Sequence, residues 1–247
     1  MLLQKKNAVI TGCNKGIGKK LVEVFSENGA NINACVRAPD AEFIEFTKEI
    51  EKKNKNKINI IKLDLSNKEE VKIAANEIIS KTSSIDILVN NAAIIHTALF
   101  QMTSEKKLKE IFDVNFFSQT TFTQYILKSM MKNKRGSIIY ISSSSAIDGN
   151  RGRSAYSAAK AALLSQAKTL SKEVGEFNIR VNAIAPGLTK TDMMTENTEK
   201  KIIDEVTSQI SLKRVASPKE IANVALFLSS DLASYITGQF LRVDGGM

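Results

Sequence analysis

NAVITGCNKGIG, residues 7–18, joins an apolar run typical of a buried strand to a glycine-rich turn, and an amphipathic stretch, Gly18–Glu27, follows it. Glycine permits tight turns and a close approach of the backbone to a ligand. The unpaired N–H groups at the start of a helix attract phosphate. In this order of strand, turn and helix, the segment predicts a pyrophosphate site for a dinucleotide, although it has the spacing G-x-x-x-G-x-G. Packing of the helix against the strand is the alternative role for these glycines.

Strand and helix patterns alternate along the rest of the chain. Further strands are expected at Asn31–Val36, Ile58–Leu63, Ile85–Val89, Gly136–Ser142, Ile179–Ile184 and Gln239–Val243, with helices at Ala41–Lys52, Lys68–Lys81, Glu105–Met131, Tyr156–Glu176 and Pro218–Ser229. This alternation predicts an α/β fold with a doubly wound parallel sheet, the Rossmann fold, with helices on both faces and a ligand crevice at the carboxyl ends of the strands. We expect a single domain over residues 1–247, with a substrate lid at about residues 188–212.

Composition narrows the class of protein. The 247 residues are 43% hydrophobic, enough for a core without metals or disulfides. No run of about 18 apolar residues and no leader pattern occurs, so we expect a soluble, cytoplasmic protein with no membrane partner. Cys13, Cys35 and the single His96 match no zinc or redox pattern, so no metal site is predicted.

The net charge of +9 would fit a nucleic acid, an acidic protein partner or a phosphorylated substrate. The densest basic run, Glu51–Lys57, has no interleaved aromatic residues and resembles a solvated helix end and loop. We therefore predict no nucleic-acid partner.

The end of the second strand bears on the choice of nicotinamide cofactor. A sheet that binds NAD normally has an acidic residue there, whereas this strand ends at Arg37. Arg37 and Lys15 could both approach a 2′-phosphate, which favours NADP(H), with NAD(H) as the alternative. Asp64 and Leu65, after the third strand, are placed to contact an adenine ring.

Tyr156 and Lys160 have the spacing of neighbours on one helix face. A free phenol has a pKa of about 10, and an adjacent ammonium stabilises the phenolate, which brings proton transfer within reach of physiological pH. Ser143, at the end of the preceding strand, could donate a hydrogen bond to a substrate oxygen as negative charge develops there.

These segments together resemble the signature set of the classical short-chain dehydrogenases/reductases. The matching motifs are Thr11-Gly12-x-x-x-Gly16-x-Gly18, Asn90-Asn91-Ala92, Asn115, Ser143, Tyr156-x-x-x-Lys160 and Pro186-Gly187. Within the family the chain is most similar to bacterial 3-oxoacyl-[acyl-carrier-protein] reductases, notably in residues 186–193 and 235–247. The resemblance covers essentially the whole chain.

The resemblance implies roles for individual residues. Tyr156 would be the general acid in reduction, and Lys160 would bind the nicotinamide ribose and lower the tyrosine pKa. Ser143 would polarise the carbonyl, and Asn115 would hold a water in a proton relay. Substrate contacts are expected at Ser143, Arg153 and Tyr156. The expected cofactor contacts are Gly12, Asn14, Lys15, Gly16, Ile17, Gly18, Arg37, Asp64, Leu65, Asn91, Ala92, Tyr156, Lys160, Pro186, Gly187, Thr189 and Thr191.

Three departures bear on the substrate. Ala93 replaces the last glycine of the family's NNAG, Arg153 stands where carrier-protein reductases commonly have Gln, and Phe177 occupies a place where a basic residue would dock an acidic carrier. The leading hypothesis is an NADP(H)-dependent homotetrameric reductase of fatty acid biosynthesis that acts on a small-molecule or carrier-bound 3-oxoacyl carbonyl. The alternative is an enzyme for a sugar or another polar, phosphorylated or anionic substrate. A non-catalytic dinucleotide-binding protein is the remote alternative.

Overall fold

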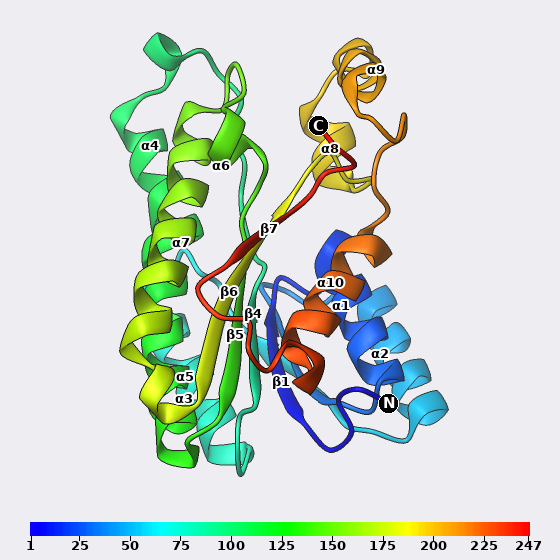
Figure 1. Cartoon of the computed structure of the whole chain (residues 1–247), viewed down its shortest axis with the longest axis vertical. Coiled ribbons are helices and arrows are strands. Elements are labelled where there is room, and N and C mark those ends of the chain that lie inside the picture. The colour runs from blue at the N-terminus through cyan, green and yellow to red at the C-terminus, as the bar shows by residue number, and fades with distance from the viewer.

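A seven-stranded parallel sheet forms the centre of the molecule, and helices cover both of its faces (Figure 1). The computed structural model describes all 247 residues. The strand order is β3-β2-β1-β4-β5-β6-β7, and every pairing is parallel. The strands are β1 (Asn7–Thr11), β2 (Asn31–Val36), β3 (Ile58–Lys62), β4 (Ile87–Asn90), β5 (Gly136–Ile141), β6 (Ile179–Pro186) and β7 (Phe240–Val243). The predicted α/β fold with a doubly wound parallel sheet is confirmed.

The helices divide between the two faces of the sheet. Helices α1 (Gly16–Glu27), α2 (Ala41–Asn54) and α10 (Pro218–Ser229) cover one face, and α3 (Lys68–Lys81), α5 (Ser118–Asn133) and α7 (Ser154–Glu173) cover the other (Figure 1). The remaining α-helices are α4 (Glu105–Phe112), α6 (Ser145–Asp148), α8 (Asp192–Asn197) and α9 (Lys200–Gln209), with 3₁₀ turns at Phe100–Met102, Gly175–Phe177 and Asp231–Ala233. None of these helices is both long and apolar enough to cross a membrane.

Two apolar cores follow from the alternation of side chains along each strand. Successive residues of a strand point to opposite faces. Ile10 accordingly belongs to a buried cluster of 26 residues beneath α1, α2 and α10, whereas its neighbour Val9 belongs to a cluster of 23 residues beneath α3, α5 and α7. The sheet therefore receives helices on both sides, and its carboxyl edge stays free for a ligand.

The structure differs from the sequence expectation at Glu105–Met131. The single predicted helix is two helices, α4 and α5, joined by a π-helical turn at Asp113–Phe117. Such single-turn π-bulges occur frequently at functional sites. Here the turn contains Asn115, whose side chain is fully buried.

The stretch predicted as a lid, residues 188–212, contains two helices that the weak sequence periodicity did not indicate. Helices α8 and α9 project from the carboxyl edge of the sheet, away from the main helical layers (Figure 1). After α9 the chain returns to the C-terminal segment, where the N–H of Leu212 donates to the carbonyl of Gly245 at 3.1 Å. The segment therefore extends over the edge of the sheet at which the crevice is expected.

The phenylalanines at the α4–α5 junction give a test of the packing. Phe122 is fully buried in the 23-residue cluster, whereas Phe117 is 53% exposed. We expect Phe122→Ala to lower the free energy of unfolding by about 3–5 kcal/mol, because it leaves a cavity in a close-packed core. Phe117→Ala should lower the free energy of unfolding by less than about 1 kcal/mol. Urea unfolding of both variants measures the difference. Equal losses for the two variants would contradict this assignment of the core.

Candidate active site

One large cleft of about 2100 Å³ lies at the carboxyl edge of the sheet. It is lined by every residue that the sequence predicted to contact the cofactor or the substrate, including Arg153. Of the four predicted catalytic residues, Ser143, Tyr156 and Lys160 line the cleft, while Asn115 lies behind its wall. Residues from both halves of the chain therefore meet in one place, as expected for a doubly wound sheet.

The glycines of the turn after β1 are required by geometry. Gly12 and Gly16 have positive φ angles of 72° and 58°. A Cβ on Gly18 would lie 1.9 Å from the carbonyl oxygen of Gly12, and one on Gly12 would lie 2.8 Å from the Cα of Ala92. No side chain caps the start of α1, so the N–H groups of its first turn remain available to an anion. The turn fits the pyrophosphate of a dinucleotide.

Hydrogen bonds fasten this turn to the end of β4. The Thr11 hydroxyl accepts from the backbone N–H groups of Asn91 (2.9 Å) and Ala92 (3.0 Å). In return, the side-chain amide of Asn91 donates to the carbonyls of Thr11 (2.9 Å) and Gly12 (3.1 Å). Asn91 was predicted to contact the cofactor. The structure shows that its amide group holds the glycine-rich turn after β1 in place.

The cations expected near a 2′-phosphate lie on two sides of the cleft. Arg37 is exposed. Burial acts to raise the pKa of Asp64, but hydrogen bonds from Ser66 and the charge of Arg37 outweigh this effect, and the pKa of Asp64 is lowered. Lys15 extends across the cleft toward α8, where its ammonium lies 3.4 Å from Asp192 and 3.6 Å from Glu196. A phosphate at Lys15 would therefore compete with two carboxylates of α8.

Tyr156 faces the cleft beside Ser143, at the start of α7. Burial raises the pKa of the Tyr156 phenol, and the neighbouring Ser143 hydroxyl and the positive charge of Arg153 oppose that rise. Ser143 is in turn held in place, because its Oγ lies 2.9 Å from the Oγ of Ser145 and accepts from the backbone N–H of Ser145 at 3.2 Å. Two hydroxyl groups that line one cleft, Tyr156 and Ser143, could donate hydrogen bonds to the same substrate oxygen.

Lys160 lies one turn further along α7 and is only 1% exposed. Its Nζ donates to the carbonyl of Ile141 at 2.6 Å and lies 5.9 Å from the centre of the Tyr156 ring. Burial lowers the pKa of Lys160 to about 7. In the structure without cofactor, the cation whose charge lowers the pKa of Tyr156 is therefore Arg153, a contribution that sequence reasoning did not anticipate.

Asn115 braces the wall behind these residues. Its Oδ1 accepts from the backbone N–H of Ile94, and its Nδ2 donates to the carbonyl of the same residue, both at 2.8 Å. Gln119, one turn later, donates to the carbonyl of Ala92 at 2.7 Å. The side chains of Asn115 and Gln119 thus fix the loop after β4, and the water relay expected at Asn115 stays a prediction.

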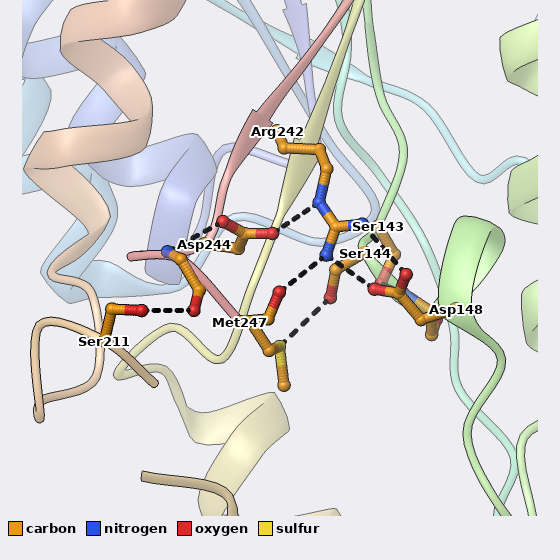
Figure 2. Close-up of polar contacts among 9 residues, drawn as sticks. Ser143, Ser144, Asp148, Ser211, Arg242, Asp244 and Met247 are labelled. Atoms are coloured by element: carbon orange, nitrogen blue, oxygen red, sulfur yellow. Dashed lines mark hydrogen bonds and ion pairs between the residues drawn. The ribbon is translucent and has the colours of Figure 1, made fainter. Parts of the chain in front are cut away.

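The turn that carries Ser143 is clamped by the C-terminal segment (Figure 2). Arg242 on β7 forms a bidentate ion pair with Asp148 at 2.8 and 2.6 Å, and its Nε donates to Asp244 at 2.6 Å. The Ser144 hydroxyl lies 3.7 Å from the sulfur of Met247. Sequence reasoning missed this cluster, because no local pattern indicates a pairing between residues 94 positions apart.

Comparisons with known proteins agree with this geometry. Residues 12–247 match a family model described as enoyl-(acyl carrier protein) reductase. The chain is 37% identical over 246 residues to the 3-oxoacyl-[acyl-carrier-protein] reductase FabG of Chlamydia muridarum, an alignment that covers 100% of this chain and 98% of the relative.

The chain belongs to the short-chain dehydrogenase/reductase family.

Other members of the family differ in the substrates that their names give. An acetoacetyl-CoA reductase from Acinetobacter is 33% identical over 99% of this chain and 98% of its own length. A crystal structure of a putative NAD(P)-dependent gluconate 5-dehydrogenase from Beutenbergia cavernae, with bound NADP, superimposes with a TM-score of 0.92 at 31% identity, over 99% of this chain and 97% of that one. The short-chain dehydrogenase/reductase described here is accordingly an NAD(P)-dependent oxidoreductase, and its substrate is not fixed by these similarities.

Lys160 gives a prediction about stability and pH. Its pKa is about 7 in the folded protein and 10.5 when unperturbed, so the unfolded chain binds more protons between these values. Stability should therefore rise with pH across this window, and the cost of burying Lys160 should be greatest at pH 7 and below.

Without cofactor, we expect Lys160→Met to raise the free energy of unfolding at pH 7 by up to about 4 kcal/mol, from a shift of roughly three pKa units. The gain should shrink as the pH approaches 10. Urea unfolding of both proteins between pH 7 and 9.5 measures this difference, and parallel pH dependences for the two would contradict it.

Proposed function

We propose that this short-chain dehydrogenase/reductase is an NADP(H)-dependent reductase of 3-oxoacyl thioesters, carried by acyl carrier protein or by a smaller thiol. The observation that carries the proposal is the placement of Tyr156, Ser143 and Lys160 in the same cleft as the glycine turn after β1. The names of the similar FabG and acetoacetyl-CoA reductases support the acyl substrate class.

The chemistry divides between the cofactor and the chain. The reduced nicotinamide supplies the hydride when bound. Tyr156 donates the proton from its hydroxyl to the substrate oxygen, and Ser143 donates a hydrogen bond to that oxygen as its negative charge grows. Lys160 leaves the Ile141 carbonyl to hold the nicotinamide ribose. Its positive charge then adds to that of Arg153 in lowering the pKa of Tyr156.

The residues around the glycine turn would hold the rest of the cofactor. The N–H groups at the start of α1 and the hydroxyls of Thr189 and Thr191 would bind its phosphates, and Asp64 and Leu65 would contact the adenine; all of these residues line the cleft. Arg37 and Lys15 would bind the 2′-phosphate, because a guanidinium and an ammonium both bind phosphate and no carboxylate stands at the end of β2.

A homotetramer follows from the same resemblance, and exposed apolar side chains support it. Phe100 is 81% exposed, Met102 is 72% exposed and Phe117 is 53% exposed. Monomeric proteins rarely leave such clusters in water. The cytoplasmic location stays a prediction from the sequence.

A second candidate is a reductase or dehydrogenase of a polar, anionic ketone or alcohol. Arg153 favours it, because this cation lies in the cleft close to Tyr156. The structural similarity to a putative gluconate 5-dehydrogenase supports the same class.

The proposed reaction is tested by oxidation of NADPH, followed at 340 nm, with acetoacetyl thioesters, sugar acids and simple ketones. We expect turnover of the thioesters, and Tyr156→Phe should lower kcat at least about 100-fold, since general acid catalysis contributes about 10²–10⁴-fold. Tyr140→Phe is the matched control, because Tyr140 is fully buried in the core and lies outside the cleft. Turnover of sugar acids alone would replace the first candidate by the second, and an active Tyr156→Phe would exclude the assigned acid.

Cofactor preference gives a separate test. Arg37→Glu should raise the KM for NADPH by about 10- to 100-fold, the value of a hydrogen bond to a charged group, and leave the KM for NADH little changed. Lys132→Glu makes a like change of charge at the exposed end of α5 and should leave both constants unaltered. A wild-type enzyme that uses NADH better than NADPH would refute the proposed preference.

A further inference from the structure

Arg153 precedes α7 and has an incomplete set of partners. Its Nη2 donates to the carbonyl of Asn197 at 2.7 Å and to the hydroxyl of Thr198 at 3.3 Å, at the end of α8. Its Nη1 is sealed from solvent and has no acceptor. Buried donors are normally satisfied, and one that is not calls for an explanation.

The charge of Arg153 is also uncompensated. Arg214 and Arg242 pair with carboxylates, whereas no carboxylate lies within 4.0 Å of Arg153. Burial lowers the pKa of Arg153, the reverse of the change at Arg214, whose pKa the adjacent Glu220 raises. A half-buried cation without an anion is costly, and a ligand oxygen that reached Nη1 would offset this cost.

The unpartnered nitrogen belongs to the catalytic cleft. Arg153 and Tyr156 both line it, three residues apart and so about one helical turn from each other. The loop before Arg153 pairs with the loop after β4, where the N–H of Ala98 donates to the carbonyl of Gly152 at 3.0 Å. On that second loop, His96 also lines the cleft and its Nε2 is likewise buried without a partner. Two buried polar atoms without hydrogen-bond partners therefore lie on adjoining loops that line one cleft.

We propose that the guanidinium of Arg153 binds a second oxygen of the substrate, close to the carbonyl that Tyr156 protonates, and that this contact selects 3-oxo compounds over simple ketones. The inference rests on the proposed function. The second oxygen belongs either to a thioester carbonyl or to a carboxylate, and both accept a hydrogen bond from a guanidinium. Because Nη2 of the same group holds Asn197 and Thr198, the bound substrate is linked directly to the end of α8.

Steady-state kinetics with three ketones test the selection. The ketones are acetoacetyl-N-acetylcysteamine, acetoacetate and butanone, which lacks a second oxygen. Arg153→Gln should lower kcat/KM for the first two ketones by about 10- to 100-fold, the cost of one charge-assisted hydrogen bond. It should change kcat/KM for butanone less than about threefold. The larger loss of the two identifies the source of the oxygen, either thioester or carboxylate.

Two matched variants separate substrate binding from other roles. Arg151→Gln removes an equal charge from an exposed side chain that lines the same cleft, two residues away, and should leave the discrimination intact. Thr198→Val weakens only the contact of Nη2 with α8 and should affect the three ketones equally. A uniform loss in Arg153→Gln, or an equal loss of discrimination in Arg151→Gln, would overturn the proposal.

The pH profile provides a readout that a purely structural role would not move. The reduction requires protonated Tyr156, so its rate falls as the pH rises through the tyrosine pKa. Without the positive charge of Arg153 that pKa rises, so Arg153→Gln should move the alkaline limb to higher pH and Arg153→Lys should restore it. An unchanged limb in Arg153→Gln would count against the proposed site.

Calorimetry with acetoacetate and the protein saturated with NADP⁺ distinguishes this inference from the proposed function. If no ketone is reduced but acetoacetate binds at least about tenfold more weakly to Arg153→Gln than to Arg151→Gln, the function fails and the Arg153 site stands. If thioesters are reduced and both variants bind and react alike, the function stands and the Arg153 site fails. If wild type neither reduces the ketones nor binds acetoacetate, both are overturned.

Discussion

The connection between the end of β1 and the end of β4 is the constraint on which the rest of the site depends. These strands are neighbours in the sheet but 80 residues apart in the chain, and four hydrogen bonds between Thr11, Gly12, Asn91 and Ala92 join their ends. The space between them is so small that Gly12 cannot carry a Cβ. The phosphate-binding turn and the loop that leads to the catalytic helices are therefore positioned as one unit, and a change on either side displaces both.

Sequence patterns located the sheet because its strands are apolar, β-branched and buried on both faces. They gave β1, β2 and α3 with the boundaries seen in the structure. They failed where tertiary contacts decide local structure. The π turn at Asn115 exists because its amide pairs with Ile94, a contact that no helical periodicity records. Helices α8 and α9 were not predicted. Helix α8 has only six residues, and α9 buries no residue, although Ile203 and Val206 lie at helical spacing along it. Motif spacing named residues that the fold brings to one cleft, whereas it could not give the partners of Lys15 and Arg242.

Burial changes the effect that Lys160 was predicted to have on the pKa of Tyr156. Neighbouring positions on one face of α7 predicted that Lys160 would lower the pKa of Tyr156, but burial lowers the pKa of Lys160 itself to about 7, and the cation that opposes the rise of the Tyr156 pKa is Arg153. Binding a ribose would replace the Ile141 carbonyl with further acceptors and favour the charged lysine.

Two cations hold α8 from opposite sides of the cleft. Lys15, on the cofactor side, contacts the carboxylates of Asp192 and Glu196, and Arg153, on the substrate side, contacts the far end of the same helix. A phosphate at Lys15 would draw this side chain away from α8, whereas the guanidinium of Arg153 is proposed to bind a substrate oxygen. A phosphate at Lys15 would therefore release Asp192 and Glu196, while the contact of Arg153 with Asn197 would still hold the end of α8. The sheet and α7 fix the chemistry common to the family, and the loops that carry Arg153 and α8 determine which carbonyl reaches it.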